Sequence, residues 1–222
     1  MKRTALALAA LVLALAACTK SGGTVSYTLT FDSTDKARQE YLTNAALRVI
    51  ERRVAAMKGK VESKKGSVKD GKGTVIVTLS DPSLIDALTS QLTRSFSFRV
   101  MRAAAGGETP DVSLPRLGDF KETGITEQHL VWLTSGTNPL TLKGAVSIKF
   151  SEEGQAILKN TFAKYKGKKI AIFVQGLLVS QLISDGAAQD TIQIDGIPTA
   201  DLADVFADDV NAGTHVKFAP AR

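Results

Sequence analysis

Several residue types are scarce in this chain of 222 residues, and their scarcity excludes whole classes of protein. A single cysteine excludes any disulfide within the chain. The two histidines, His129 and His215, lie far apart in the sequence, and no cysteine–histidine cluster has the spacing of a zinc site. The motifs of zinc proteases, serine hydrolases and phosphate-binding loops do not occur either. We therefore expect no catalytic residues, no metal site and no cofactor, and we interpret the chain as not being an enzyme.

Long apolar runs are also missing, because no stretch reaches the length that a membrane-spanning helix needs. Residues 4–17 form the longest run, which is too short to span a bilayer and follows two basic residues, as in a signal peptide. Leu15-Ala16-Ala17 then precedes Cys18, which is the lipobox pattern of bacterial lipoproteins. We expect residues 1–17 to be removed as a signal peptide and Cys18 to be lipidated. The alternative is an ordinary secretory signal beside a chance cysteine.

The segment that follows this cysteine is short. Residues 18–24 include Ser21-Gly22-Gly23 and reach at most about 20 Å, so a lipidated tether would hold the folded part next to the membrane. Several acyl carbons, at about 0.8 kcal/mol per buried methylene group, would make this a firm anchor. The prediction is a lipid-anchored protein that faces the periplasm or extracytoplasmic space. Thr19 and Lys20 carry no aspartate retention signal, which leaves the cell membrane and the outer membrane both open.

The charge balance is mildly basic. The 28 lysines and arginines of the whole chain exceed the 22 acidic residues, and loss of residues 1–17 would remove two basic ones. This excess does not indicate a nucleic-acid partner. Lysines gather around an expected turn at Asp70-Gly71, where they either meet lipid headgroups or protect an edge strand from aggregation: Lys58, Lys60, Lys64, Lys65, Lys69 and Lys72.

Residues 25–102 show the order strand, helix, strand, strand, helix, strand. This order is that of a ferredoxin-like βαββαβ sandwich, and we name this part the base. The expected elements are Val25–Asp32, a helix over Asp35–Met57, Lys60–Ser67, Thr74–Leu79, a helix capped by Asp81, and Phe96–Val100. A further alternating segment, residues 214–219, predicts a final strand.

Residues 103–213 predict a second α+β unit, which we name the head. Residues 103–117 are rich in glycine, alanine and proline, and we expect a linker between the two parts. The elements expected after it are a strand over Ala145–Phe150, a helix capped by Ser151 and ended by Gly167, the strands Lys169–Val174, Leu177–Ile183 and Thr191–Ile194, and a helix over Ala200–Asn211 closed by Gly213.

Two groups of charged residues have both a structural and a functional interpretation. Arg48, Arg52 and Arg53 are either a solvated helix edge or a binding surface. Four carboxylates on the last helix resemble a cation site, although such spacing is routine on the polar face of an amphipathic helix: Asp201, Asp204, Asp208 and Asp209.

The segment Leu177–Ile183 (LLVSQLI) lacks a clean alternation of apolar and polar residues. It is either a strand buried on both faces, or a strand with an exposed apolar face that could hold an unfolded chain by strand addition or side-chain pockets. Under the second interpretation the candidate polypeptide-binding residues are Leu177, Leu178, Val179, Leu182 and Ile183.

A string of short pieces resembles one known family. The pieces are F-S-E-E-G from Phe150, G-K-K-I-A-I-F-V-Q-G from Gly167, D-T-I-Q-I-D-G-I-P-T-A-D-L-A-D from Asp190, and N-A-G ending at Gly213. Their order and spacing are similar to the first periplasmic domain of SecD, the membrane partner of the bacterial Sec protein-export channel. R-V-I-E-R-R-V from Arg48 and F-S-F-R-V-M from Phe96 resemble the base of the same domain. The resemblance covers nearly all of residues 22–219.

The resemblance implies a base that is completed by the final strand, with the head inserted into it. It also implies a role in binding or assisting exported polypeptides at the Sec translocon, with translocon subunits and unfolded polypeptides as partners. This chain lacks the membrane helices through which SecD uses proton flow, so we do not expect a motor. The alternative hypothesis is a stand-alone module for binding or assembly in the cell envelope, with no Sec role.

Overall fold

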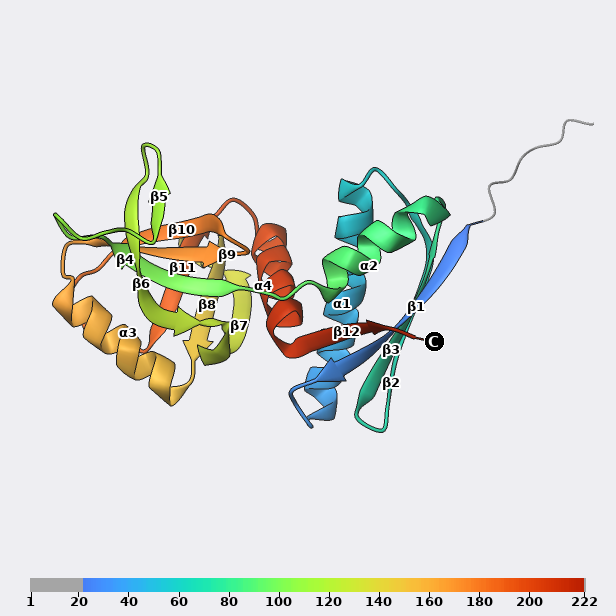
Figure 1. Cartoon of the computed structure of the whole chain (residues 1–222). Helices are drawn as coiled ribbons and strands as arrows, with labels where there is room; N and C mark the ends of the chain where they lie inside the picture. Colours follow the sequence, from blue (N-terminus) through green and yellow to red (C-terminus); the bar gives the residue numbers. More distant parts are fainter. Residues whose placement is uncertain (1–21, 222) are drawn as a thin grey trace, which may run out of the picture.

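The computed structural model describes residues 22–221, and the predicted signal peptide and Cys18 lie outside these residues. The described chain forms three antiparallel sheets with helices packed on them, in agreement with the expected α+β class. Figure 1 shows two lobes, the base and the head, with helix α4 (Ala200–His215) between them.

The base is a four-stranded sheet with strand order β12-β1-β3-β2, covered by two helices. This is the ferredoxin-like order, with the last strand of the chain in the fourth-strand position. Its elements are β1 (Gly23–Phe31), α1 (Lys36–Ala56), β2 (Val61–Lys69), β3 (Lys72–Leu79), a 3-10 turn (Pro82–Leu84) that leads into α2 (Ile85–Thr93), and β12 (Val216–Pro220).

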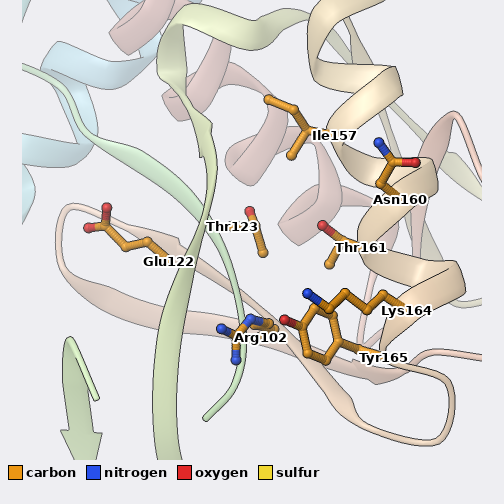
Figure 2. A pocket seen from close by; sticks show the side chains of 8 residues that line it. All are labelled: Arg102, Glu122, Thr123, Ile157, Asn160, Thr161, Lys164 and Tyr165. Atoms are coloured by element: carbon orange, nitrogen blue, oxygen red, sulfur yellow. The ribbon is translucent and has the colours of Figure 1, made fainter. Parts of the chain in front are cut away.

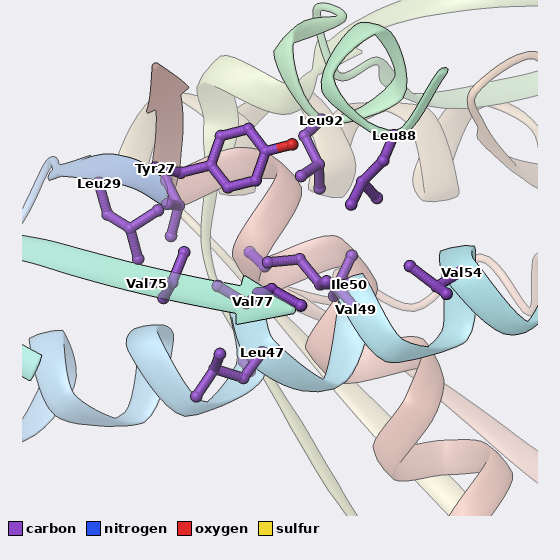
Figure 3. Close-up of a cluster of buried hydrophobic side chains, with 14 of the residues drawn as sticks. Tyr27, Leu29, Leu47, Val49, Ile50, Val54, Val75, Val77, Leu88 and Leu92 are labelled. Atoms are coloured by element: carbon purple, nitrogen blue, oxygen red, sulfur yellow. The ribbon is translucent and has the colours of Figure 1, made fainter. Parts of the chain in front are cut away.

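The base core lies between α1 and one face of the sheet (Figure 3). The carboxylate of Asp35 accepts the amide of Arg38 at 2.9 Å and caps α1, as expected for an aspartate at this position. The buried face of α1 then meets inward side chains of β1 and β3, and Tyr27 closes the contact with α2 through a 2.7 Å hydrogen bond to Thr89. The residues that fill this space include Leu42, Ala46, Ile50, Val54, Leu29, Val75 and Val77.

The head contains the other two sheets. The five-stranded sheet has the order β10-β9-β4-β6-β5, and the three-stranded sheet has the order β11-β8-β7. The strands are β4 (Phe98–Ala103), β5 (Val112–Leu114), β6 (Gly118–Thr126), β7 (Leu130–Thr137), β8 (Gly144–Phe150), β9 (Lys169–Val174), β10 (Leu177–Ile183) and β11 (Thr191–Ile197). Helix α3 (Glu152–Lys164) is capped by Ser151, as expected, and α3 and α4 share a core with both sheets.

Strand β4 is a correction to the predicted division at residue 102. The alternating phenylalanines suggested the fourth strand of the base, but β4 lies between β9 and β6 in the head sheet. The physical reason is burial on both faces: Phe98 and Val100 pack in one cluster, while Met101 packs in another on the opposite face. The fourth-strand position of the base belongs to β12, which pairs with β1.

The expected linker and helix end also differ from the structure. Residues 103–117 lie within the head and include β5, whereas the chain crosses from base to head at residues 94–97. Helix α4 does not end at Gly213 but continues to His215. Gly213 lies inside the helix, where the ring of Phe96 packs against it. The final strand begins at Val216 rather than at residue 214.

Candidate functional site

The segment that lacked clean alternation is an edge strand with a bulge. The turn Gln175-Gly176, with both φ angles positive, folds β10 back antiparallel to β9, as in a tight hairpin. The register shifts between Leu178 and Ser180, so Val179 is the additional residue of a β-bulge. The bulge places Leu178 on one face of the sheet and Leu182 on the other. Two leucines four residues apart therefore contact different cores.

Neither of the two alternative interpretations of this strand describes it fully. Leu178 and Leu182 are partly buried, and they pack against the third and second core clusters respectively. By contrast, Leu177, Val179 and Ile183 are 70%, 42% and 59% exposed. The five predicted residues thus divide into two that support the sheet and three that present apolar surface to solvent.

A groove of about 350 Å³ adjoins this strand. One wall is formed by Val179 and Ser180 of β10, and the facing wall by the end of β11 and the beginning of α4. The register of β11 also shifts, between Ile194 and Ile197, and Gly196 has a φ of +78° there. The apolar lining consists of Val179, Ile194, Ile197, Pro198, Leu202 and Phe206, and Asp195 is the charged member of the lining.

Two other edge strands, β7 and β2, differ from β10 in their side chains and contacts. Along β7, the side chain of Asn211 donates to the Leu133 carbonyl and accepts the Leu133 amide, both at 2.9 Å. Arg38 donates to the neighbouring Val131 carbonyl at 2.7 Å. In the base, β2 is an edge strand that carries lysines, which is compatible with both interpretations of the basic hairpin. Strand β10 (LLVSQLI) has no charged side chain and no proline.

The arginine and aspartate groups are joined across the two lobes. Asp208, whose side chain is 4% exposed, accepts two hydrogen bonds from Arg48 at 2.7 and 2.8 Å. Burial alone raises the pKa of Asp208, but the hydrogen bonds and charge of Arg48 outweigh it, and the pKa lies below its ordinary value. Arg52 pairs with Asp209 at 2.6 Å. These contacts between α1 and α4 place Arg48, Arg52, Asp208 and Asp209 at the joint, rather than on a solvated edge or in a cation site.

The other arginine and aspartate residues of these two groups do not pair with each other. Arg53 donates to the Gln91 carbonyl of α2, and Asp204 accepts from Ser135 at 2.5 Å. No group of three or more metal-ligating side chains is found within residues 22–221. In the same residues, no helix is both long enough and apolar enough to cross a membrane.

The two histidines lie in different settings, as their separation in the sequence suggested. His129 accepts the amide of Thr126 at 3.1 Å in the 3-10 turn Glu127–His129. His215 lies at the joint, where its ring stacks on Trp132 and its Nδ1 is 2.6 Å from a carboxylate oxygen of Asp32. Burial lowers the pKa of His215 below its ordinary value, and the hydrogen bond with Asp32 offsets only part of this effect.

A polar cavity of about 310 Å³ lies between α3 and the strands β4 and β6 (Figure 2). Arg102 lies 4.4 Å from the ring centre of Tyr165, and it forms two hydrogen bonds with Glu108 at 2.6 and 2.7 Å. These bonds hold the pKa of Glu108 at about 2. The sequence pattern did not indicate this cavity, because its lining comes from three separated elements. The charge of Arg102 is already neutralised, so the cavity is a weaker candidate than the apolar groove.

Comparisons with known proteins support the fold. No family model and no curated protein matches the sequence. SecDF, a translocon-associated membrane protein from Thermus thermophilus, superposes on 91% of this chain with a TM-score of 0.52 and 17% identity. SecDF in a super-membrane-facing form covers 91% with a TM-score of 0.48 and 16% identity. A structure of SecDF as a membrane component that enhances protein export covers 89% of this chain and 98% of its own, with a TM-score of 0.46 and 16% identity.

The chain spans about a third of the longer SecDF chains, 31% and 30% of their lengths. At these identities the likeness establishes the fold alone. The fold of this chain is SecD-like, with a ferredoxin-like base and an inserted α+β head.

Proposed function

We propose that this chain is a lipid-anchored extracytoplasmic protein that binds exported polypeptides in an unfolded state, close to the Sec translocon. The observation that carries the proposal is the exposed apolar edge of β10 beside the groove toward β11. Exposed apolar side chains that adjoin an apolar groove are typical of a binding surface. The SecD-like fold adds to this argument, since the similar solved structure of SecDF is named as a translocon-associated membrane protein.

The size of the surface fits transient binding. Burying one leucine-sized side chain contributes about 1.5–3 kcal/mol, so three exposed residues contribute at most about 9 kcal/mol, which limits the affinity to the micromolar range, about −8 kcal/mol, or weaker. A partner held by apolar contacts is selected by side-chain character rather than by one sequence. Weak and tolerant binding suits a protein that holds a passing chain and then releases it.

A matched pair of substitutions tests this proposal. Val179 and Ile76 are both 42% exposed, but Val179 lines the groove whereas Ile76 lies on β3 of the base. We expect Val179→Asp to abolish cross-linking to a reduced, unfolded test polypeptide and to leave the melting temperature within a few degrees. Ile76→Asp should retain both the cross-linking and the melting temperature. Equal cross-linking by the two variants would exclude the groove as the binding surface.

Co-purification from membranes tests the Sec partnership separately. The lipidated chain should co-purify with Sec channel subunits, and Cys18→Ser should weaken this by removing the anchor. Binding of polypeptide without any channel subunit would favour the alternative hypothesis of a stand-alone envelope module.

A further inference from the structure

We propose that a bound polypeptide adds a strand to the edge of β10, in the gap between β10 and β11, and places one apolar side chain in the groove. This inference rests on the proposed function and specifies its mode: the partner is an extended segment recognised through its main chain. Three features carry it, namely two open sheet edges, the direction of the backbone groups of β10, and the apolar lining between them.

Both walls of the groove are strand edges. Strand β10 ends the order of the five-stranded sheet, and β11 ends the order of the three-stranded sheet, so neither outer edge has a strand neighbour. The groove is lined by both strands, which brings these two edges to opposite sides of one depression. An open edge offers a row of main-chain donors and acceptors to another extended chain.

The backbone groups that face the gap follow from the pairing with β9. Ser184 donates its amide to the carbonyl of Lys168, and the register continues without a shift from Ile183 back to Ser180. Residues of an antiparallel pair turn their backbone groups alternately toward the partner and away from it. The amides and carbonyls of Leu182 and Ser180 therefore face β9, whereas those of Gln181 and Ile183 face the open edge.

The bulge limits where the added strand can pair. A bulge interrupts regular pairing and turns a side chain in a new direction. At β10 it leaves the regular segment Ser180–Ile183 for pairing and directs Val179 to the groove lining. The incoming segment would thus pair over about four residues and place an apolar side chain beside Val179.

The charges of the groove restrict the partner further. Asp195 is the charged residue of its lining, and β10 has no charged side chain. Acidic residues in the partner would be repelled at this point, whereas neutral and basic residues would be tolerated. The expected partner is an extended, uncharged or basic segment with a leucine-sized or larger side chain.

N-methylated peptides test the main-chain contacts directly. The probe is a ten-residue peptide of alternating leucine and threonine with a lysine at each end, measured by fluorescence anisotropy with the full chain. Two modified peptides carry N-methyl groups on the odd or on the even residues. We expect one of them to bind at least about tenfold more weakly than the unmodified peptide and the other to bind unchanged, since an added strand uses alternate amides.

A variant of the protein gives a second readout. Gln181→Pro removes an amide that faces the open edge and no amide that pairs with β9, so the fold should persist while peptide binding falls. In the unmodified protein, amide hydrogen exchange at Gln181 and Ile183 should slow by about tenfold when peptide saturates the site. Ser180 and Leu182 should change little.

The outcomes separate the two proposals. Equal binding of both methylated peptides, with unchanged exchange at Gln181 and Ile183, would overturn strand addition and leave binding by side chains alone. Failure of the unmodified peptide to bind, together with failure of cross-linking to unfolded polypeptide, would overturn the proposed function itself.

Discussion

Replacing Asn211 by alanine should strongly destabilise the contact between helix α4 and the three-stranded sheet. Asn211 is fully buried, and its amide satisfies both the N–H and the C=O of Leu133, a residue only 1% exposed. Alanine would leave both backbone groups buried without a partner, at about 1–3 kcal/mol for each. The expected loss is therefore about 4 kcal/mol of unfolding free energy, close to 8–16 °C in melting temperature for a protein of this size.

Urea unfolding measures this loss with an intrinsic reporter. Trp132 is the single tryptophan of the chain, and it lies at the joint between the ring of Tyr41 and that of His215. Its fluorescence should report the separation of the lobes, while circular dichroism follows the helices. The matched control is Asn160→Ala on α3, an exposed asparagine whose loss should change stability by less than about 0.5 kcal/mol.

A loss below about 1 kcal/mol for Asn211→Ala would refute the reasoning, because it would mean that water or a rearranged strand satisfies Leu133. The variant Asn211→Asp tests whether the side chain at this position must donate a hydrogen bond as well as accept one. Its carboxylate can accept the Leu133 amide, but its second oxygen would face the Leu133 carbonyl. We therefore expect this variant to be destabilised as well, and more at neutral than at acidic pH.

Three further predictions concern the joint and the anchor. Burial lowers the folded-state pKa of His215, so the unfolded chain binds more protons than the folded chain as the pH falls below about 6.5. The free energy of unfolding should therefore decrease from pH 7 to pH 5. His215→Gln should show a smaller decrease in thermal scans. Gly213→Ala should lower the melting temperature by several degrees in calorimetry, since the added methyl group would overlap the ring of Phe96; an unchanged value would show that this ring moves aside freely. Cys18→Ser should move the protein to the aqueous phase in detergent phase separation, and retention in the detergent phase with an uncleaved signal would show that hydrophobicity rather than lipid held it.

Much of the element order followed from local chemistry. The caps at Asp81 and Ser151 act within a few residues, so the sequence indicated them correctly. The order of the strands in the sheets could not be predicted from such local signals. Strand β4 has the same apolar alternation that a base strand would have, and only its neighbours on both sides distinguish the two positions.

The candidate site was predicted only in part, again because contacts between distant residues determine the rest of it. The apolar run of β10 was visible in the sequence, but the bulge at Val179 decides which of its side chains are exposed. A bulge depends on the partner strand and leaves little trace in a single sequence. The pairing of Arg48 with Asp208 joins residues 160 positions apart, so each group by itself resembled a solvated helix face.

The position of β12 after the whole head in the sequence determines when the base can close. Synthesis makes β1 first and β12 last, and the whole head lies between these paired strands. Until β12 is available, one edge of β1 has no neighbour, and the helices of the base cover an unfinished sheet. Closing a loop this long is slow relative to forming the hairpin of β2 and β3. We expect the head to fold as an internal unit before the base does, so the base reaches its final form last.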